Sequence, residues 1–70
     1  MKPDYKAVVK QDGEWWVGWI EEIPGVNSQG ETREELMGNL ASALQEAIEM
    51  NRESARDAAG DDYEEVTITT

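Results

Sequence analysis

The 70-residue sequence predicts a small α+β domain, with a mostly antiparallel sheet and one long helix across one face, in the order β-β-β-α-β. Extended runs at residues 4–10 and 15–21 flank a short polar turn, which is typical of a β-hairpin. Apolar residues at helical spacing follow from residue 33, and nothing breaks the helix before Gly60. Residues 63–70 then alternate between apolar and polar, which predicts a final strand.

The second extended run is apolar on both of its faces. Successive side chains of a strand point to opposite faces, so the run divides into two sets. One face is expected to carry Trp15, Val17 and Trp19, and the other Trp16, Gly18 and Ile20. The helix can cover one of these faces, so the other is expected to meet a second subunit or a bound partner. The alternative is that a single tryptophan simply lies half exposed on the sheet.

The junction between the hairpin and the helix is specified by local chemistry. Pro24 and Gly25 suit a tight turn, because proline presets φ and glycine accepts the left-handed second position. Residues 26–29 read as a short third strand. Thr32 followed by Glu35 forms a capping box, in which each side chain accepts a hydrogen bond from the other residue's N–H. The helix is therefore expected to begin directly after Thr32.

The expected helix carries one apolar stripe, which we interpret as core. The stripe consists of Leu36, Met37, Leu40, Ala41, Leu44, Ala47 and Ile48. Gly38 is unfavourable within a helix, which indicates a close approach to the sheet or to another helix. The stripe weakens after Ile48, but the helix could continue to Ala59, with Gly60 as its C-terminal cap. Val66 and Ile68 then define the buried side of the final strand.

The composition argues against most catalytic classes. The chain has no cysteine and no histidine, which removes thiolate chemistry, the commonest general base and the commonest metal ligand. Adjacent acidic residues of a strand, such as Glu21 and Glu22, point to opposite faces and are poorly placed for one metal ion. We therefore expect no catalytic residue, no metal and no cofactor. A metal-dependent nuclease remains a weaker possibility.

Two segments carry a resemblance to a known family. The residues D-G-E-W-W-V at positions 12–17 precede S-Q-G-E-T-R-E-E-L at positions 28–36, and an amphipathic helix follows. This arrangement resembles the HicB family of antitoxin domains. The resemblance implies a reduced ribonuclease H-like fold and a partner, a small basic HicA-like RNase toxin, that the domain neutralises without catalysis. Full-length members carry a second, DNA-binding domain after this one, whereas here we expect a single HicB-like domain over residues 1–70.

The charge agrees with such a partner, because sixteen acidic and six basic residues give a net charge of −10. An acidic surface disfavours nucleic acid and attracts a basic protein. We expect Trp15, Trp16 and Trp19 to anchor a partner or a second copy, and Glu21 and Glu22 to contact basic toxin residues. For each glutamate, a solvated charge is an equal alternative.

The alternative function is a stand-alone, self-associating scaffold module with no toxin and no catalysis. Both hypotheses predict a homo-oligomer, a dimer or larger, in the cytoplasm. No run of apolar residues is long enough to suggest a membrane partner.

Overall fold

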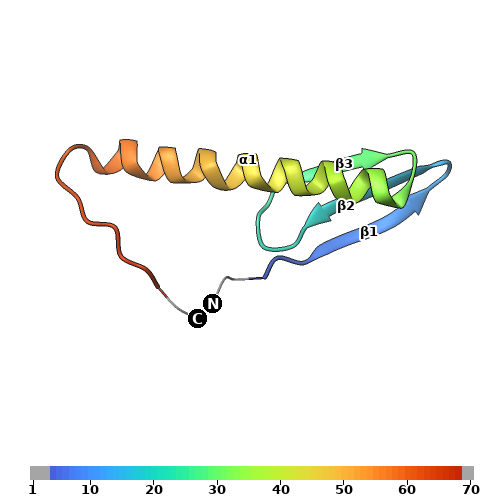
Figure 1. Cartoon of the computed structure of the whole chain (residues 1–70), viewed down its shortest axis with the longest axis horizontal. Helices are drawn as coiled ribbons and strands as arrows, with labels where there is room; N and C mark the ends of the chain where they lie inside the picture. The colour runs from blue at the N-terminus through green and yellow to red at the C-terminus, as the bar shows by residue number, and fades with distance from the viewer. Residues whose placement is uncertain (1–3, 69–70) are drawn as a thin grey trace.

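A computed structural model describes residues 4–68 and shows a three-stranded antiparallel sheet and one long helix (Figure 1). The elements follow in the order β1 (Ala7–Asp12), β2 (Trp15–Ile20), β3 (Asn27–Gly30) and α1 (Arg33–Ala59). The sheet order is β1-β2-β3, so β2 is central. The predicted α+β class and the order β-β-β-α are therefore confirmed.

Local chemistry sets the turns and the helix ends as expected. Gly25 has φ +88°, a left-handed conformation that side chains disfavour. The Thr32 Oγ1 accepts a hydrogen bond from the Glu35 N–H at 3.0 Å, which is the first half of the expected capping box. The reciprocal bond is not among the hydrogen bonds of residues 4–68. At the other end, Gly60 has φ +81° and its N–H donates to the Arg56 carbonyl at 3.2 Å.

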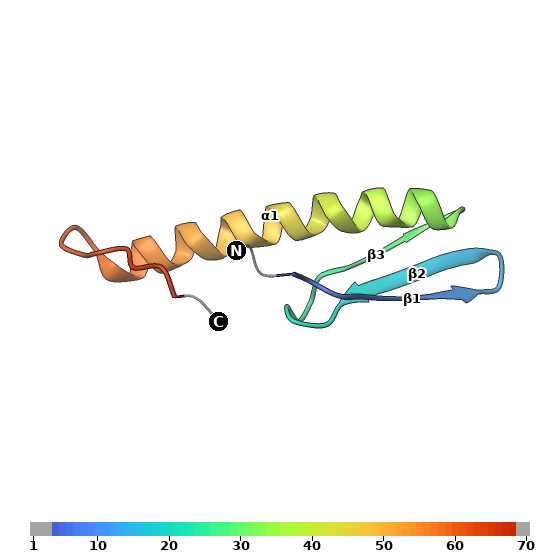
Figure 2. The ribbon, with the colours of Figure 1, turned by 60° about the horizontal axis from the view of Figure 1, so that its bottom comes forward.

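The core is small and lies between α1 and one face of the sheet. Its buried members are Ile20, Val26, Leu36 and Leu40, and partly buried apolar side chains pack around them. The helix lies close to β3 and β2, whereas every Cα of β1 is more than 8 Å from those of α1. Figure 2 shows this tilt, with β3 nearest the helix and β1 farthest from it. The core therefore sits toward one edge of the sheet.

The helix differs from the expectations at Met37, Ala41 and Gly38. Met37 and Ala41, predicted to be core, are exposed, because α1 lies over β3 and β2 and leaves their side of the helix beyond the packed layer. Gly38 does not approach the sheet, since a Cβ built there would meet nothing within 4 Å. Close approaches occur instead at Gly18, where a Cβ would lie 3.0 Å from the Leu40 Cδ1 atom, and at Gly30, where it would lie 2.7 Å from the Leu36 N atom.

The predicted final strand is not formed by residues 63–68, which have no regular secondary structure. Val66 is 74% exposed and Ile68 is 85% exposed, so the expected buried side of the segment is in solvent. The physical reason is that a strand needs a partner, and no strand of residues 4–68 lies beside this segment. The expected ribonuclease H-like arrangement, which needs this strand, is not shown either. Residues 69 and 70 of the predicted strand lie outside the described part of the chain.

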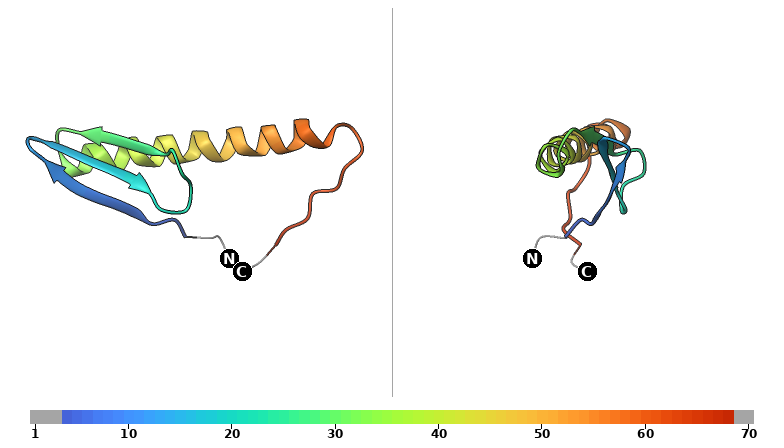
Figure 3. Two further views of the ribbon diagram at one scale, coloured as in Figure 1. Left: turned by 180° about the vertical axis from the view of Figure 1, so that it is seen from behind. Right: turned by 90° about the vertical axis from the view of Figure 1, so that its right-hand side faces the viewer.

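The molecule is elongated because α1 continues well past the sheet (Figures 1 and 3). Its dimensions are 50 × 23 × 16 Å and its radius of gyration is 15.1 Å. A compact domain of this length would have a radius of gyration of about 11 Å. From Glu49 onward every described residue is exposed, so the second half of the helix contributes nothing to the core.

Candidate binding surface

The sheet face opposite the helix carries an uncovered apolar strip, which we call the open face: Val8, Trp15, Val17 and Trp19. The register places Val8 opposite Trp19 and Asp12 opposite Trp15, with Val17 between the tryptophans along β2. Trp15 is 45% exposed and Trp19 is 42% exposed. Two half-exposed indoles on one face of a small sheet form a preorganised apolar surface, and aromatic side chains of this kind often anchor protein interfaces.

Trp16 lies on the other side of the same strand. It pairs with Gln11 and Gly30 and packs, partly buried, against the core beneath the helix. The structure therefore brings Trp15 and Trp19 together and separates Trp16 from them. The sequence predicted this division of the three tryptophans, but it could not say which set the helix would cover.

The two candidate glutamates lie just beyond the Trp19 end of β2, and both are exposed. The Glu21 N–H donates to the Lys6 carbonyl at 2.9 Å, which continues the pairing of β1 with β2. The Glu22 Oε1 accepts a hydrogen bond from the Lys6 N–H at 2.9 Å. Glu22 thus already holds the start of β1, while the carboxylate of Glu21 has no hydrogen-bond or ion-pair partner among residues 4–68.

A second apolar surface was missed by the sequence analysis. A shallow groove of about 150 Å³ opens between α1 and the β1 side of the sheet. We call it the β1 groove; it is lined by Tyr5, Ala7, Met37, Leu40, Ala41 and Leu44, with Ile20 at its floor. The sequence carried one signal of this groove. The apolar stripe of the helix is wider than the area that β2 and β3 can cover.

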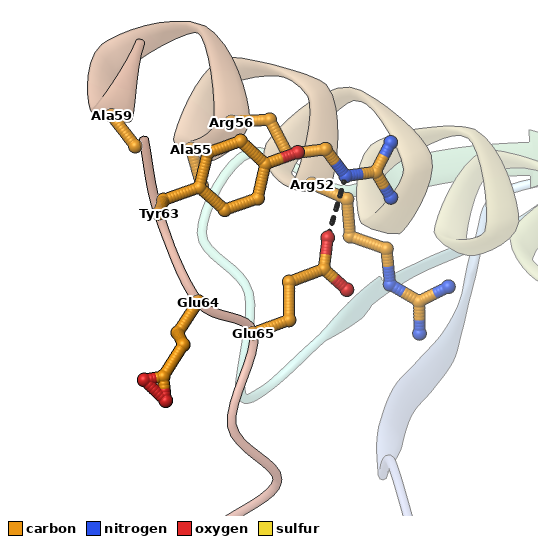
Figure 4. A pocket seen from close by; sticks show the side chains of 7 residues that line it. All are labelled: Arg52, Ala55, Arg56, Ala59, Tyr63, Glu64 and Glu65. Carbon is orange, nitrogen blue, oxygen red and sulfur yellow. Dashed lines mark hydrogen bonds and ion pairs between the residues drawn. The ribbon is translucent and has the colours of Figure 1, made fainter. Parts of the chain in front are cut away.

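A third feature is an open pocket of about 420 Å³ at the far end of the helix (Figure 4). Arg52 and Arg56 reach into it from α1. Tyr63 and Glu65 come from residues 61–68 after the helix, which we call the tail. The Arg56 Nε lies 3.2 Å from the Glu65 Oε1, with side-chain exposures of 48% and 69%. An ion pair this exposed contributes little to stability. The pocket is best described as the place where the tail folds back on its own helix.

The described residues offer little else for chemistry. Across residues 4–68 no three acidic side chains come together in a way that could hold a metal ion. No side chain of this part of the chain is both polar and buried. Within the same range, no helix has the length and apolar character needed to cross a bilayer.

These features define a small α+β protein with two half-exposed tryptophans on the open face of its sheet and an apolar groove beside β1. The sequence is 36% identical over 70 residues to UPF0150 protein ssl0738 from Synechocystis sp., and the match covers 97% of this chain and 96% of that protein. The chain belongs to the UPF0150 family. The name of this relative states no activity or partner. No family model and no solved structure match the sequence.

Proposed function

We propose that this chain is a HicB-like antitoxin domain that binds and neutralises a small basic HicA-like RNase. The observation that carries the proposal is the open face: Trp15 and Trp19 are half exposed on one side of β2, with acidic residues beyond both ends of the strip. Asp12 lies opposite Trp15, Glu14 directly precedes Trp15, and Glu21 lies beyond Trp19. Lys10 also lies on this face, opposite Val17, so the strip carries charges of both signs, and the carboxylates at its two ends are the groups that suit a basic partner.

The proposed mechanism is blockade without catalysis. The net charge of −10 steers a cationic protein toward the domain. The indoles then dock against apolar or cationic side chains of the toxin, where a guanidinium stacked on an indole adds stabilisation. Once the domain is seated, its carboxylates occupy the positive surface that RNA phosphates would need.

The test is an affinity measurement between the tagged chain and a small basic protein recovered with it from the source cells. Replacing Trp15 and Trp19 together by alanine is expected to weaken the complex by at least about a hundredfold, since buried aromatic anchors each contribute on the scale of 2 kcal/mol. The matched control is Met50→Ala, which removes an apolar side chain that is 65% exposed and remote from the sheet. An unchanged affinity of the double variant would contradict this assignment.

The second candidate is the self-associating module with no toxin, and the observation that favours it is the second uncovered apolar surface, the β1 groove. Recovery of only the chain itself, from cells shown to express a candidate toxin, would favour this alternative.

A further inference from the structure

We propose that residues 63–68 of one copy complete the sheet of a second copy, by pairing with the free edge of β1 and covering the β1 groove. The inference concerns self-association and does not depend on a toxin. Three observations carry it: an open sheet edge, an unfilled apolar groove beside that edge, and an exposed alternating segment that cannot cover its own groove.

The first observation is the edge of β1. The Glu21 N–H bonds to the Lys6 carbonyl, which sets the alternation of the β1–β2 ladder. The backbone groups of Ala7, Val9 and Gln11 therefore point away from β2, and none of them has a partner among residues 4–68. The opposite edge is better protected, because β3 is short and the Asn39 side chain donates to the Gln29 carbonyl at 2.9 Å. An open edge of this kind accepts an added strand.

The second observation is the apolar groove beside this edge. Side chains of Ala7 and Val9 share the face of Ile20 and Gly18, so the groove and the core lie on the same side of the sheet. A strand added next to β1 would project alternate side chains over Met37, Ala41 and Leu44. The groove therefore has the position expected for the buried side of a fourth strand.

The third observation is the tail itself. Val66 and Ile68 are two residues apart, so in an extended segment both point to the same side. They are 74% and 85% exposed, the largest values among the exposed large hydrophobic side chains. Thr67 would point to the opposite side, toward the open face. The segment has the pattern of a half-buried strand but has no sheet in which to bury it.

The length of α1 decides which copy supplies the strand. From Ala59 back to Leu44, the helical residue of the groove nearest the tail, the axis spans about 22 Å at about 1.5 Å per residue. Asp61 and Asp62 form the bend, so the returning chain from Asp62 spans about 13 Å to Val66 and about 20 Å to Ile68 when fully extended. Val66 therefore falls well short of its own groove, and Ile68 reaches no further than the Leu44 end, so the tail cannot cover the part of its own groove that extends to Met37. Figures 1 and 3 agree, since the tail turns back beneath α1 without reaching the strands.

A second copy removes this limit, because its tail can approach the β1 edge from outside. The exchange is reciprocal in a two-fold dimer, so each copy gives one strand and receives one. Each sheet then has four strands, and both exposed aliphatic side chains of each tail become covered.

Intermolecular disulfide trapping tests the proposal, and the chain has no cysteine of its own. Val8 lies on the open face between Ala7 and Val9, next to the β1 groove, which is where Thr67 of the added strand would lie. Mixing the single variants Val8→Cys and Thr67→Cys under mild oxidation is expected to give a disulfide-linked heterodimer, since a disulfide needs Cβ atoms about 4 Å apart. Glu14→Cys, at the hairpin turn, is the control partner and should not couple with Thr67→Cys.

The double variant Val8→Cys/Thr67→Cys shows whether the added strand comes from the same copy or from the other copy. A covalent dimer supports the exchange between copies. A monomer with an internal disulfide would overturn it, because the helix would then have to unwind and deliver the tail to its own sheet.

A charge variant gives a second readout that needs no disulfide. Val66→Glu is expected to raise the dimer dissociation constant at least about tenfold, on the scale of losing one buried valine side chain. Thr67→Glu adds the same charge one residue away on the other side of the segment and should have a much smaller effect. Equal effects of the two variants, or a chain that is monomeric throughout in sedimentation, would contradict the proposal.

Discussion

At the residue scale, Gly18 allows the helix to lie close to the centre of the sheet. A Cβ at this position would lie 3.0 Å from the Leu40 Cδ1, the Val8 carbonyl oxygen and the Val9 Cγ1. Two of these neighbours are side chains of a packed layer and the third is backbone, so none can move freely. The helix can approach the centre of the sheet only because residue 18 has no side chain.

Gly18→Ala is therefore expected to lower the free energy of unfolding by about 1–3 kcal/mol through overpacking. Urea unfolding followed by tryptophan fluorescence measures the change. Gly38→Ala is the matched control, because its Cβ would meet nothing within 4 Å. The control should be stabilising by up to about 1 kcal/mol, the helix-propensity difference. A stabilising Gly18→Ala would show that the helix does not pack as described.

At the element scale, α1 is one continuous helix with two different environments. Its first half carries the buried side chains Leu36 and Leu40 and packs on β3 and β2. Its second half, from Glu49, is exposed at every position and ends at a local cap on Gly60. Tertiary packing stabilises the first half, whereas the second half depends on its own hydrogen bonds and on helix propensity.

Amide hydrogen exchange is expected to divide the helix at this boundary. Amides of residues 51–59 should exchange at least about tenfold faster than those of residues 36–47, because local opening there breaks no core contact. Mass spectrometry of peptic fragments from the two halves measures the difference. Uniform protection along the helix would show that something covers the second half in solution.

At the scale of the whole molecule, charge distinguishes the two kinds of association proposed for this chain. Two copies that each carry −10 repel one another, while a basic partner is attracted. Salt screens both the repulsion between copies and the attraction of a basic partner. Added salt therefore strengthens the dimer and weakens the complex with the partner.

Raising the salt concentration from about 0.05 M to about 0.5 M shortens the Debye length from above 10 Å to below 5 Å. The dimer is then expected to become tighter and the complex with a basic partner weaker. Analytical ultracentrifugation of the chain alone, and calorimetry with the partner, measure the two trends. A dimer that weakens with salt would contradict an interface formed mainly by apolar side chains and backbone pairing.

Features that depend on neighbouring residues follow from the sequence alone. The division of β2 into two apolar faces follows from strand alternation, the start of α1 from the Thr32 cap, and its end from Gly60. Each of these depends on interactions within a few residues, so the local sequence contains the needed information.

Which apolar surfaces are covered depends on how the helix packs on the sheet. Both faces of β2 are apolar in sequence, and the position of α1 over β3 and β2 buried the Trp16 face and left Trp15 and Trp19 exposed. The same position left Met37 and Ala41 beside an unfilled groove, and the long helix leads the tail away from the sheet. These outcomes depend on where a long rigid helix lies across a three-stranded sheet. Strand alternation separates the two faces of β2 but does not place the helix over one of them.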